Sequence, residues 1–308
     1  MKKSLIALSV LAVSGAAMAQ SSVTVYGVAD VYVAKVKDQS VAAASGGLST
    51  SRLGFKGSED LGGGLAATFN LEQKINLGNG ATNAKTFDRQ ANVGLKGSFG
   101  TVKIGRNWDA MDDVFGAANS GFDSALSANA VWLNGYVGAA DAQLYYATPS
   151  FGGVSAAVST QLSGNAPTGK LTAFNVAYAK GPVAVNLGYE KVSGGQKGTV
   201  LNGSYDLGAA KLLASYYTTK DTGGKIGAKV NSYQLGVDVP LSSAVVVSAG
   251  YASSKPTGGD ADTGFGVAVG YNLSKRTTVY GGVRAESRKA SNGQKDGDIY
   301  AVGLKHAF

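Results

Sequence analysis

Apolar and polar residues alternate one by one along most of this chain. Between residues 64 and 75, for example, Leu65, Ala67, Phe69 and Leu71 alternate with Thr68, Asn70, Glu72 and Lys74. Successive side chains of a β-strand point to opposite faces of the sheet, so this period of two predicts strands with one apolar face and one wet face. About sixteen segments have this pattern. They lie at 22–36, 50–60, 64–75, 86–98, 101–106, 141–148, 153–162, 171–180, 182–191, 199–207, 210–219, 230–239, 242–252, 263–273, 277–286 and 298–308.

The connections between these segments fall into two classes that take turns along the chain. The tight turns lie at 60–63, 99–100, 149–152, 181–182, 206–208, 240–241 and 273–276. The longer polar connections, rich in Gly, Ser and Asn, lie at 37–49, 76–85, 107–140, 163–170, 192–198, 220–229, 253–262 and 287–297. Short periplasmic turns that alternate with longer external loops are typical of an up-and-down barrel in a bacterial outer membrane.

Strands that span a lipid bilayer must form a closed ring. Every backbone polar group inside a bilayer needs a partner, and a closed sheet has no unpaired edge. The pattern therefore predicts an all-β fold, a 16-stranded antiparallel up-and-down transmembrane β-barrel. Such a barrel encloses more space than side chains fill, which leaves an aqueous lumen unless a segment occupies it. The longest connection, residues 107–140, is the candidate, and we expect it to fold inward as a constriction loop rather than to form an external flap.

The N-terminal residues 1–19 have the three parts of a cleaved signal peptide. Lys2 and Lys3 are basic, the stretch 5–13 is apolar, and residues 17–19 read Ala-Met-Ala. The segment is too short to span a membrane as a helix, and no later stretch has eighteen consecutive apolar residues. We therefore expect an exported protein whose mature part, residues 20–308, is one barrel domain.

The composition fits a thin wall better than a large globular core. The chain has 45 Gly, 15 Tyr, only 5 Pro and a mean hydropathy of +0.02. It has no Cys, so disulfide bonds do not stabilise it. The formal net charge of +8 loses two units with Lys2 and Lys3. This mild positive balance suits anionic solutes or lipopolysaccharide, and we expect no nucleic-acid partner.

Residues able to carry catalysis or to bind a metal are scarce. His306 is the only histidine, and it faces outward by parity, with no serine or acid nearby that completes a triad. Asp109, Asp112 and Asp113 offer carboxylates to Ca²⁺ but lack the spacing of an EF-hand loop. We therefore expect neither an enzyme nor a protein that holds a metal or cofactor.

Several long motifs occur in a fixed order along the mature chain. They are SVTVYGVAD at 22–30, SRLGFKGSEDLGGGL at 51–65, GR at 105–106, TPSFGG at 148–153, YNLSKRT at 271–277 and HAF at 306–308. In these motifs the chain resembles the general porins of Gram-negative bacteria, particularly the β-proteobacterial branch that includes anion-selective examples. The resemblance covers essentially the whole mature chain. It implies sixteen antiparallel strands, assembly as homotrimers, and a third external loop bent into the barrel.

The resemblance also implies which residues line the constriction. In this family, basic residues of the wall face acids on the inward loop, and Arg52 matches the family's wall arginine. Arg89 falls in the basic stretch of the fourth strand. The full set that we expect there is Arg52, Arg89, Arg106, Asp109, Asp112 and Asp113. Facing charges of this kind create a transverse field that selects dipolar or charged solutes.

Two departures from the family pattern weaken the expected anion selectivity. Residues 137–141 contain no Arg, although many relatives carry one shortly before the sixth strand. Parity places Gln90 and Asn92 on the wet face of the fourth strand, so Arg89 points inward only if the end of that strand is bulged. Arg106, at the start of the long loop, is equally consistent with a structural anchor for it.

Other positions have simpler interpretations. We expect Lys56, Lys74, Lys103 and Arg284 to be solvated residues of the lumen wall rather than parts of a dedicated ligand site. The final Phe308 looks like the terminal signal that barrel-assembly machinery reads in this family.

The resemblance and the strand pattern together predict an outer-membrane porin. Such a protein forms a water-filled channel for passive diffusion of small anionic or neutral solutes and ions, here with a mild preference for anions. A substrate-preferring uptake porin and a surface adhesin with an occluded lumen are the alternatives. The expected partners are the lipid bilayer, lipopolysaccharide, further copies of the chain and barrel-assembly machinery.

Overall fold

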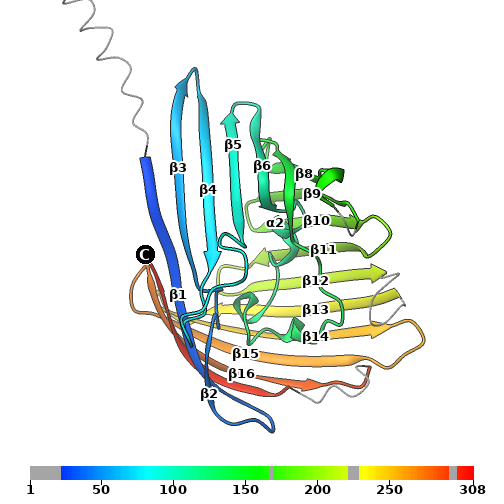
Figure 1. Ribbon diagram of the computed structural model, residues 1–308. Helices are drawn as coiled ribbons and strands as arrows, with labels where there is room; N and C mark the ends of the chain where they lie inside the picture. The colour runs from blue at the N-terminus through cyan, green and yellow to red at the C-terminus, as the bar shows by residue number, and fades with distance from the viewer. Residues whose placement is uncertain (1–21, 167–168, 221–228, 291–296) are drawn as a thin grey trace, which may run out of the picture.

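The computed structural model describes residues 22–166, 169–220, 229–290 and 297–308. Its strands form one antiparallel sheet that closes on itself where β1 pairs with β17 (Figure 1). The long strands, β1 and β3 to β17, make the wall, which confirms the predicted 16-stranded barrel. The strands are β1 (Ser22–Val36), β2 (Ala42–Ser45), β3 (Arg52–Gly62), β4 (Leu65–Lys74), β5 (Gln90–Gly97), β6 (Gly100–Trp108), β7 (Ala139–Ala147), β8 (Val154–Gln161), β9 (Leu171–Lys180), β10 (Val183–Val192), β11 (Lys197–Asp206), β12 (Lys211–Lys220), β13 (Lys229–Pro240), β14 (Val245–Pro256), β15 (Asp262–Asn272), β16 (Thr277–Ser287) and β17 (Ile299–Ala307).

The helical elements are all short. They are α2 (Asp112–Phe115), η1 (Gly121–Asp123), η2 (Ala128–Val131) and η3 (Ser163–Asn165). No helix in the described part of the chain is long and apolar enough to cross a membrane. The predicted signal peptide, residues 1–19, lies outside the described residues and stays a prediction.

The two faces of the wall differ as the alternation predicts. Val93, Ile104 and Leu144 stand opposite one another on β5, β6 and β7, and their exposed fractions are 55%, 47% and 42%. One residue earlier in β5 and β7, Asn92 and Gln143 point the other way and are buried. Lipid accepts the first set and an aqueous or protein-filled interior accepts the second.

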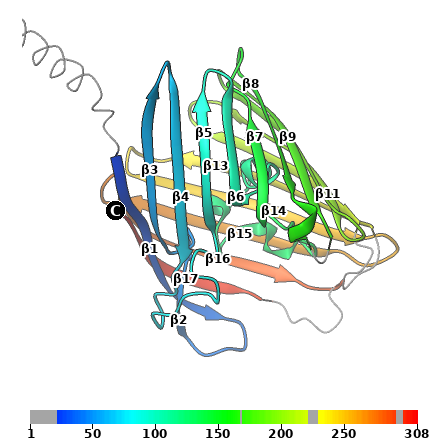
Figure 2. The same ribbon diagram turned by 45° about the horizontal axis from the view of Figure 1, so that its top comes forward.

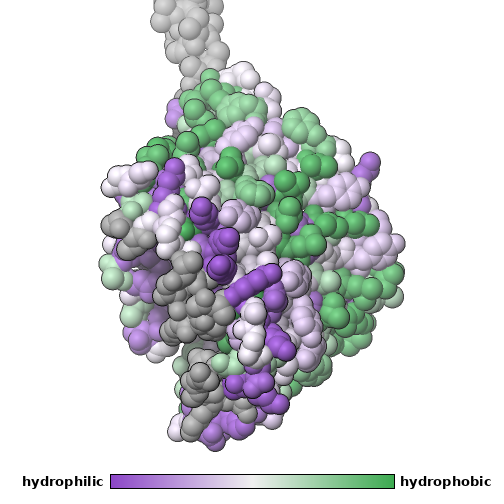
Figure 3. Space-filling model, turned by 90° about the vertical axis from the view of Figure 1, so that its right-hand side faces the viewer, coloured by the Kyte–Doolittle hydropathy of each residue, from purple (hydrophilic) through white to green (hydrophobic). Residues whose placement is uncertain are grey.

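Exposed aromatic residues gather at one end of the barrel. Phe99, Phe151, Tyr205, Tyr271 and Phe308 all lie at the end where the short turns are, and each is exposed. Figure 3 views the side that carries many of the long connections, and it shows hydrophilic side chains over the centre and lower part of this face, with apolar ones above and to the right. The position of these five aromatic residues fits an aromatic belt at one membrane interface.

The barrel closes through the first strand. Residues 22–28 of β1 pair with β3, and residues 28–36 pair with β17. Gly27 and Phe308 exchange two backbone hydrogen bonds of 3.1 Å each. The C-terminal residue thus completes the seam of the sheet.

Two local features differ from the sequence prediction. The strand expected at 86–98 begins only at Gln90, because the Asp88 carboxylate accepts the Lys74 N–H at 2.8 Å and so takes the place of a ladder bond at the end of β4. The polar connection at 37–49 contains the short strand β2, which pairs with residues 31–34 of β1. Alternation over four residues is too short a pattern to identify such a strand.

Candidate pore constriction

Residues 109–138, here called the inner loop, lie inside the barrel. Helix α2 contacts β9, β10 and β11, and η2 contacts β13 to β16. In Figures 1 and 2 alike, the inner loop lies between the strands labelled β5 and β6 and the opposite wall of β11 to β15. The longest connection therefore folds inward, as the sequence predicts.

Polar side chains of the wall hold the backbone of the inner loop. Their hydrogen bonds are Ser159 Oγ with Ala110 N (3.0 Å), Asn202 Nδ2 with Val114 O (2.7 Å), Gln234 Nε2 with Ala118 O (3.1 Å), Ser248 Oγ with Gly121 N (2.7 Å) and Ser254 Oγ with Leu133 N (3.0 Å). A buried backbone group without a partner would be costly, so these side chains supply what a strand ladder supplies elsewhere. The inward-facing polar side chains of the wall therefore anchor the inner loop.

Glycine permits the closest approach between the loop and the wall. A Cβ atom on Gly266 would lie 2.3 Å from the Leu126 carbonyl oxygen, and one on Gly250 would lie 2.0 Å from Ser120 Oγ. Neither distance is compatible with a side chain, so these positions fix how near the inner loop lies to β14 and β15.

An aromatic cluster fills the space beside α2. The Phe115 ring stacks on Tyr136 with centroids 4.1 Å apart, and it meets Tyr217 of β12 edge-on at 4.9 Å. Trp132 stacks on the same Tyr217 at 5.7 Å. Burial of aromatic surface with these geometries stabilises the docked loop.

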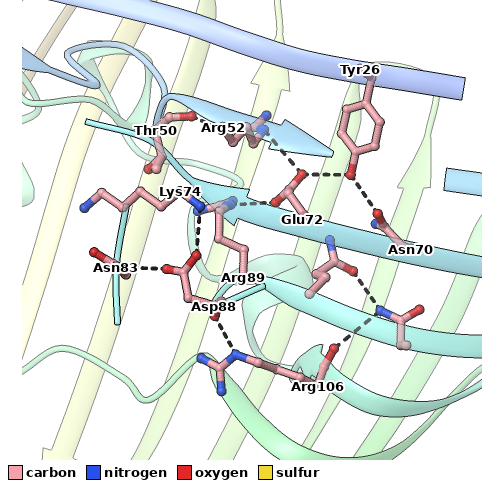
Figure 4. Close-up of polar contacts among 12 residues, drawn as sticks. Tyr26, Thr50, Arg52, Asn70, Glu72, Lys74, Asn83, Asp88, Arg89 and Arg106 are labelled. Atoms are coloured by element: carbon pink, nitrogen blue, oxygen red, sulfur yellow. Dashed lines mark hydrogen bonds and ion pairs between the residues drawn. The ribbon is translucent and has the colours of Figure 1, made fainter. Parts of the chain in front are cut away.

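On the other side of the lumen, two arginines share one carboxylate (Figure 4). Arg52 Nε lies 3.5 Å from one oxygen of Glu72, and Arg89 Nε lies 2.5 Å from the other. Tyr26 donates its hydroxyl to Glu72 at 2.9 Å. Two guanidinium groups around one carboxylate leave one net positive charge on this part of the wall.

Arg89 reaches the lumen without a bulge. It precedes the first residue of β5, so strand parity does not determine where its side chain points. Its backbone N–H donates to the backbone carbonyl of Glu72 at 3.2 Å. Its guanidinium lies 4.8 Å from the centre of the Trp108 ring. The cation–π contact and the ion pair to Glu72 together fix its side chain.

Arg106 lies at the base of the inner loop and joins its two flanking strands. Its Nη1 lies 2.6 Å from Asp141 of β7, and its Nε donates to the Asp88 carbonyl at 2.5 Å. The register between β6 and β7 shifts after Gly105, and Ala142 has a φ of 48°. This irregularity brings Arg106 and Asp141 together, so the contacts of Arg106 are those of an anchor.

The three loop aspartates have different surroundings. Asp109 is fully buried and therefore does not line the lumen. Burial raises its pKa to about 8, and the negative charge of the nearby Glu190 carboxylate acts in the same direction. One of its oxygens has no hydrogen-bond partner among the described residues, which fits a protonated carboxyl group.

Asp112 and Asp113 accept hydrogen bonds from tyrosines. Tyr136 donates to Asp112, and Tyr145 of β7 donates to Asp113 at 2.7 Å. Burial raises the pKa of Asp112 to about 6, although Arg89 is near enough to lower it. Asp112 is half-buried and Asp113 is exposed on the inner loop, and Arg89 lies within electrostatic reach of Asp112.

The remaining predicted wall residues divide into two kinds. Lys56 and Lys103 line a recess in the lumen wall, and Lys74 is exposed at the end of β4. Arg284 is not a solvated wall residue, because its guanidinium donates to the Ala125 carbonyl of the inner loop and pairs with Glu286 at 2.6 Å. It was predicted as solvated because parity gives its face but not what lies against that face.

Sequence reasoning missed two acids that organise the lumen. Glu72 stands on the wet face, but nothing in the sequence says that both arginines reach it. Asp30 is fully buried and accepts the N–H groups of Leu48 and Ser49 at 2.8 and 2.7 Å, as well as the hydroxyl of Tyr280 at 2.5 Å. The only sequence signal for this role of Asp30 was an acidic residue at an inward position of the first strand.

No metal centre is formed by the described residues. No three His, Asp or Glu side chains among them converge as metal ligands. His306 lies on the outer face, with its Nδ1 2.9 Å from the hydroxyl of Thr277.

A closed barrel with an apolar exterior and a polar lumen narrowed by an inner loop defines a passive channel of the bacterial outer membrane. The model of the Gram-negative porin family matches residues 4–291, and the chain belongs to this family. The outer membrane porin protein 32 of Delftia acidovorans is 37% identical over the full length of both chains. A porin of Bordetella pertussis is 30% identical, again over both full lengths. The solved structure of an anion-selective porin from Comamonas acidovorans superposes with a TM-score of 0.81, at 28% identity, over 94% of this chain and all of the other.

Proposed function

We propose that this porin discriminates between solutes at the level of Arg52 and Arg89 on the wall and of Asp112 and Asp113 on the inner loop, with a mild preference for anions. The observation that carries the proposal is the shared carboxylate: Arg52 and Arg89 both pair with Glu72, so these three wall residues together carry one net positive charge. The anion-selective porin from Comamonas acidovorans, which has the same fold, supports the sign of the preference.

Replacement of Arg52 tests this assignment. In Arg52→Ala, Glu72 neutralises Arg89 alone, so the net positive charge of the cluster disappears. A unit charge about 7 Å from a permeating ion is worth roughly 0.6 kcal/mol in water, favourable for an anion and unfavourable for a cation. Its removal therefore corresponds to roughly a sevenfold fall in the anion-to-cation permeability ratio. The reversal potential in a dilute KCl gradient measures this ratio, and low salt keeps screening small.

A matched control is Lys74→Ala, which removes one positive charge from an exposed position at the end of β4. We expect it to change the reversal potential less than Arg52→Ala does. An unchanged reversal potential in Arg52→Ala would contradict the assignment of the wall charge.

Three further properties belong to the proposal. We propose that the protein assembles as a homotrimer, as its family resemblance implies, and that Phe308 is read by barrel-assembly machinery. The mass of the detergent-solubilised particle, determined by light scattering with the detergent subtracted, should equal three mature chains. We also propose that it acts without catalysis, since its relatives are channels and His306 has only a hydroxyl partner among the described residues.

A further inference from the structure

A recess in the lumen wall lies next to the arginine cluster. It has a volume of about 320 Å³, and strands β1, β3, β4, β5 and β6 contribute to it. Thr24, Lys56, Asn70 and Asn92 stand opposite one another across four of these strands, so they share the inward face. Lys103 of β6 and Gln90 of β5 complete its polar lining. Among the described residues that line it, none is a carboxylate.

The two lysines of this recess are not neutralised by ion pairs. Among the described residues, Arg52, Arg89 and Arg106 each pair with a carboxylate, whereas neither Lys56 nor Lys103 does so. Asp113, which bonds to Tyr145, is the carboxylate whose charge interacts with Lys103. The recess therefore concentrates positive charge that the wall itself does not balance.

Aromatic rings hold both ammonium groups in place. Lys56 Nζ lies 4.8 Å from the centre of the Tyr26 ring, and Lys103 Nζ lies 4.8 Å from that of Tyr145. A cation–π contact restricts a long side chain without cancelling its charge. Gly94, opposite Lys103, leaves room for the stem of that lysine, since a Cβ there would lie 3.2 Å from its Cγ. The charges are thus preorganised, which lowers the entropic cost of binding an anion.

Hydrogen-bond donors accompany the charges. The Tyr26 hydroxyl, whose single proton is shared between Glu72 and Asn70, lies 2.8 Å from the side-chain oxygen of Asn70. The side-chain oxygen of Gln90 accepts the side-chain amide of Asn92 at 3.3 Å. Because the side-chain oxygens of Asn70 and Gln90 make these contacts, their side-chain nitrogens point away from Tyr26 and Asn92. These nitrogens are donors for a ligand. The hydroxyls of Thr24 and Thr68 add two more. Several donors around two cations suit the oxygens of an oxyanion better than a spherical halide.

The recess lies beyond the arginine cluster, towards the short turns. Lys56 follows Arg52 by four residues on the same face of β3, which is about 13 Å of strand. We propose that Lys56 and Lys103, with the amides of Asn70 and Gln90, form a binding site for small dianionic oxyanions such as inorganic phosphate on the periplasmic side of the constriction. This site rests on the proposed function, because an anion must first pass the arginines to reach it.

The test compares phosphate with chloride in planar bilayers at pH 7.5. For the unmodified channel, conductance should saturate with rising potassium phosphate in the millimolar range and rise in proportion to potassium chloride. In Lys56→Gln/Lys103→Gln, the phosphate conductance should lose its saturation. Added phosphate should also reduce the chloride current of the unmodified channel in a saturable way, and not that of the double variant. Heat-dependent mobility on gels verifies that each barrel has folded.

Lys305→Gln is the matched control. Lys305 lies on the inward face of β17, in the same half of the barrel, and lines a different recess with Asp238. Its replacement removes a lumen charge but should leave phosphate saturation unchanged. Saturation that persists in the double variant, or that is lost equally in Lys305→Gln, would overturn the site. Failure of the proposed function is distinguishable, since it appears as an unchanged chloride reversal potential in Arg52→Ala.

Discussion

Gly266→Val is expected to lower the single-channel conductance severalfold. The new Cβ would lie 2.3 Å from the Leu126 carbonyl oxygen, so the inner loop must move by about 1 Å to restore ordinary contact, and the two methyl groups require more. Because β15 forms the wall behind the loop, the only free direction is towards the lumen. Single-channel recording in planar bilayers measures the change.

Gly135→Val provides the comparison for this prediction. Gly135 belongs to the same inner loop, but a Cβ there would meet no atom within 4 Å. The single-channel conductance of Gly135→Val should match that of the unmodified channel. Equal conductance in Gly266→Val would show that the distance between the loop and β15 does not determine the width of the pore.

Alkaline pH is expected to loosen the inner loop through Asp109. The docked pKa of about 8 lies above the ordinary value of 3.8, so the docked loop holds a proton that a released loop gives up. Docking is therefore most stable below about pH 4, weakens as the pH rises between these two pKa values, and loses nothing further above about pH 8. Closures of the current in bilayers should become more frequent from pH 6 to pH 8 and then level off.

Asp109→Asn should remove this pH dependence, because the amide does not ionise and stays neutral beside Glu190 at any pH. The groups that face Asp109 and also titrate are Glu190, Asp112, Tyr136 and Tyr217. Asp112→Asn is therefore the informative control, and it should keep the change between pH 6 and pH 8. A pH profile that is the same in Asp109→Asn as in the unmodified channel would assign the effect to another group.

The wall of this protein was predictable because lipid imposes a rule on each strand. Val93, Ile104 and Leu144 must be apolar wherever the strand register places them, so alternation alone reveals the fold. Alternation did not predict the short strand β2 or the late start of β5, because both depend on hydrogen bonds to distant residues. The Asp88 carboxylate, for instance, replaces a ladder bond of Lys74.

The lumen was less predictable, since alternation gives the face of a residue but not its partner. The sequence placed Arg52 on the wet face correctly, yet its pairing with Glu72 depends on Gly54, which stands opposite Glu72 and leaves room for the Tyr26 ring. Outside the strands even the face is undetermined. Asp109 is buried and Asp113 is exposed, although both stand in the same short acidic run.

The anchors of the inner loop also set the order in which the molecule can mature. The loop is synthesised before β16, but Arg284 and Arg288 of that region hold its carbonyls at Ala125 and Ala130, and Gly47 near β2 accepts the Ala125 N–H at 2.9 Å. A nascent barrel that lacks β16 therefore lacks these contacts, although the anchors on β8 to β14 are already in place. The inner loop reaches its full set of contacts only when the late strands have joined the sheet.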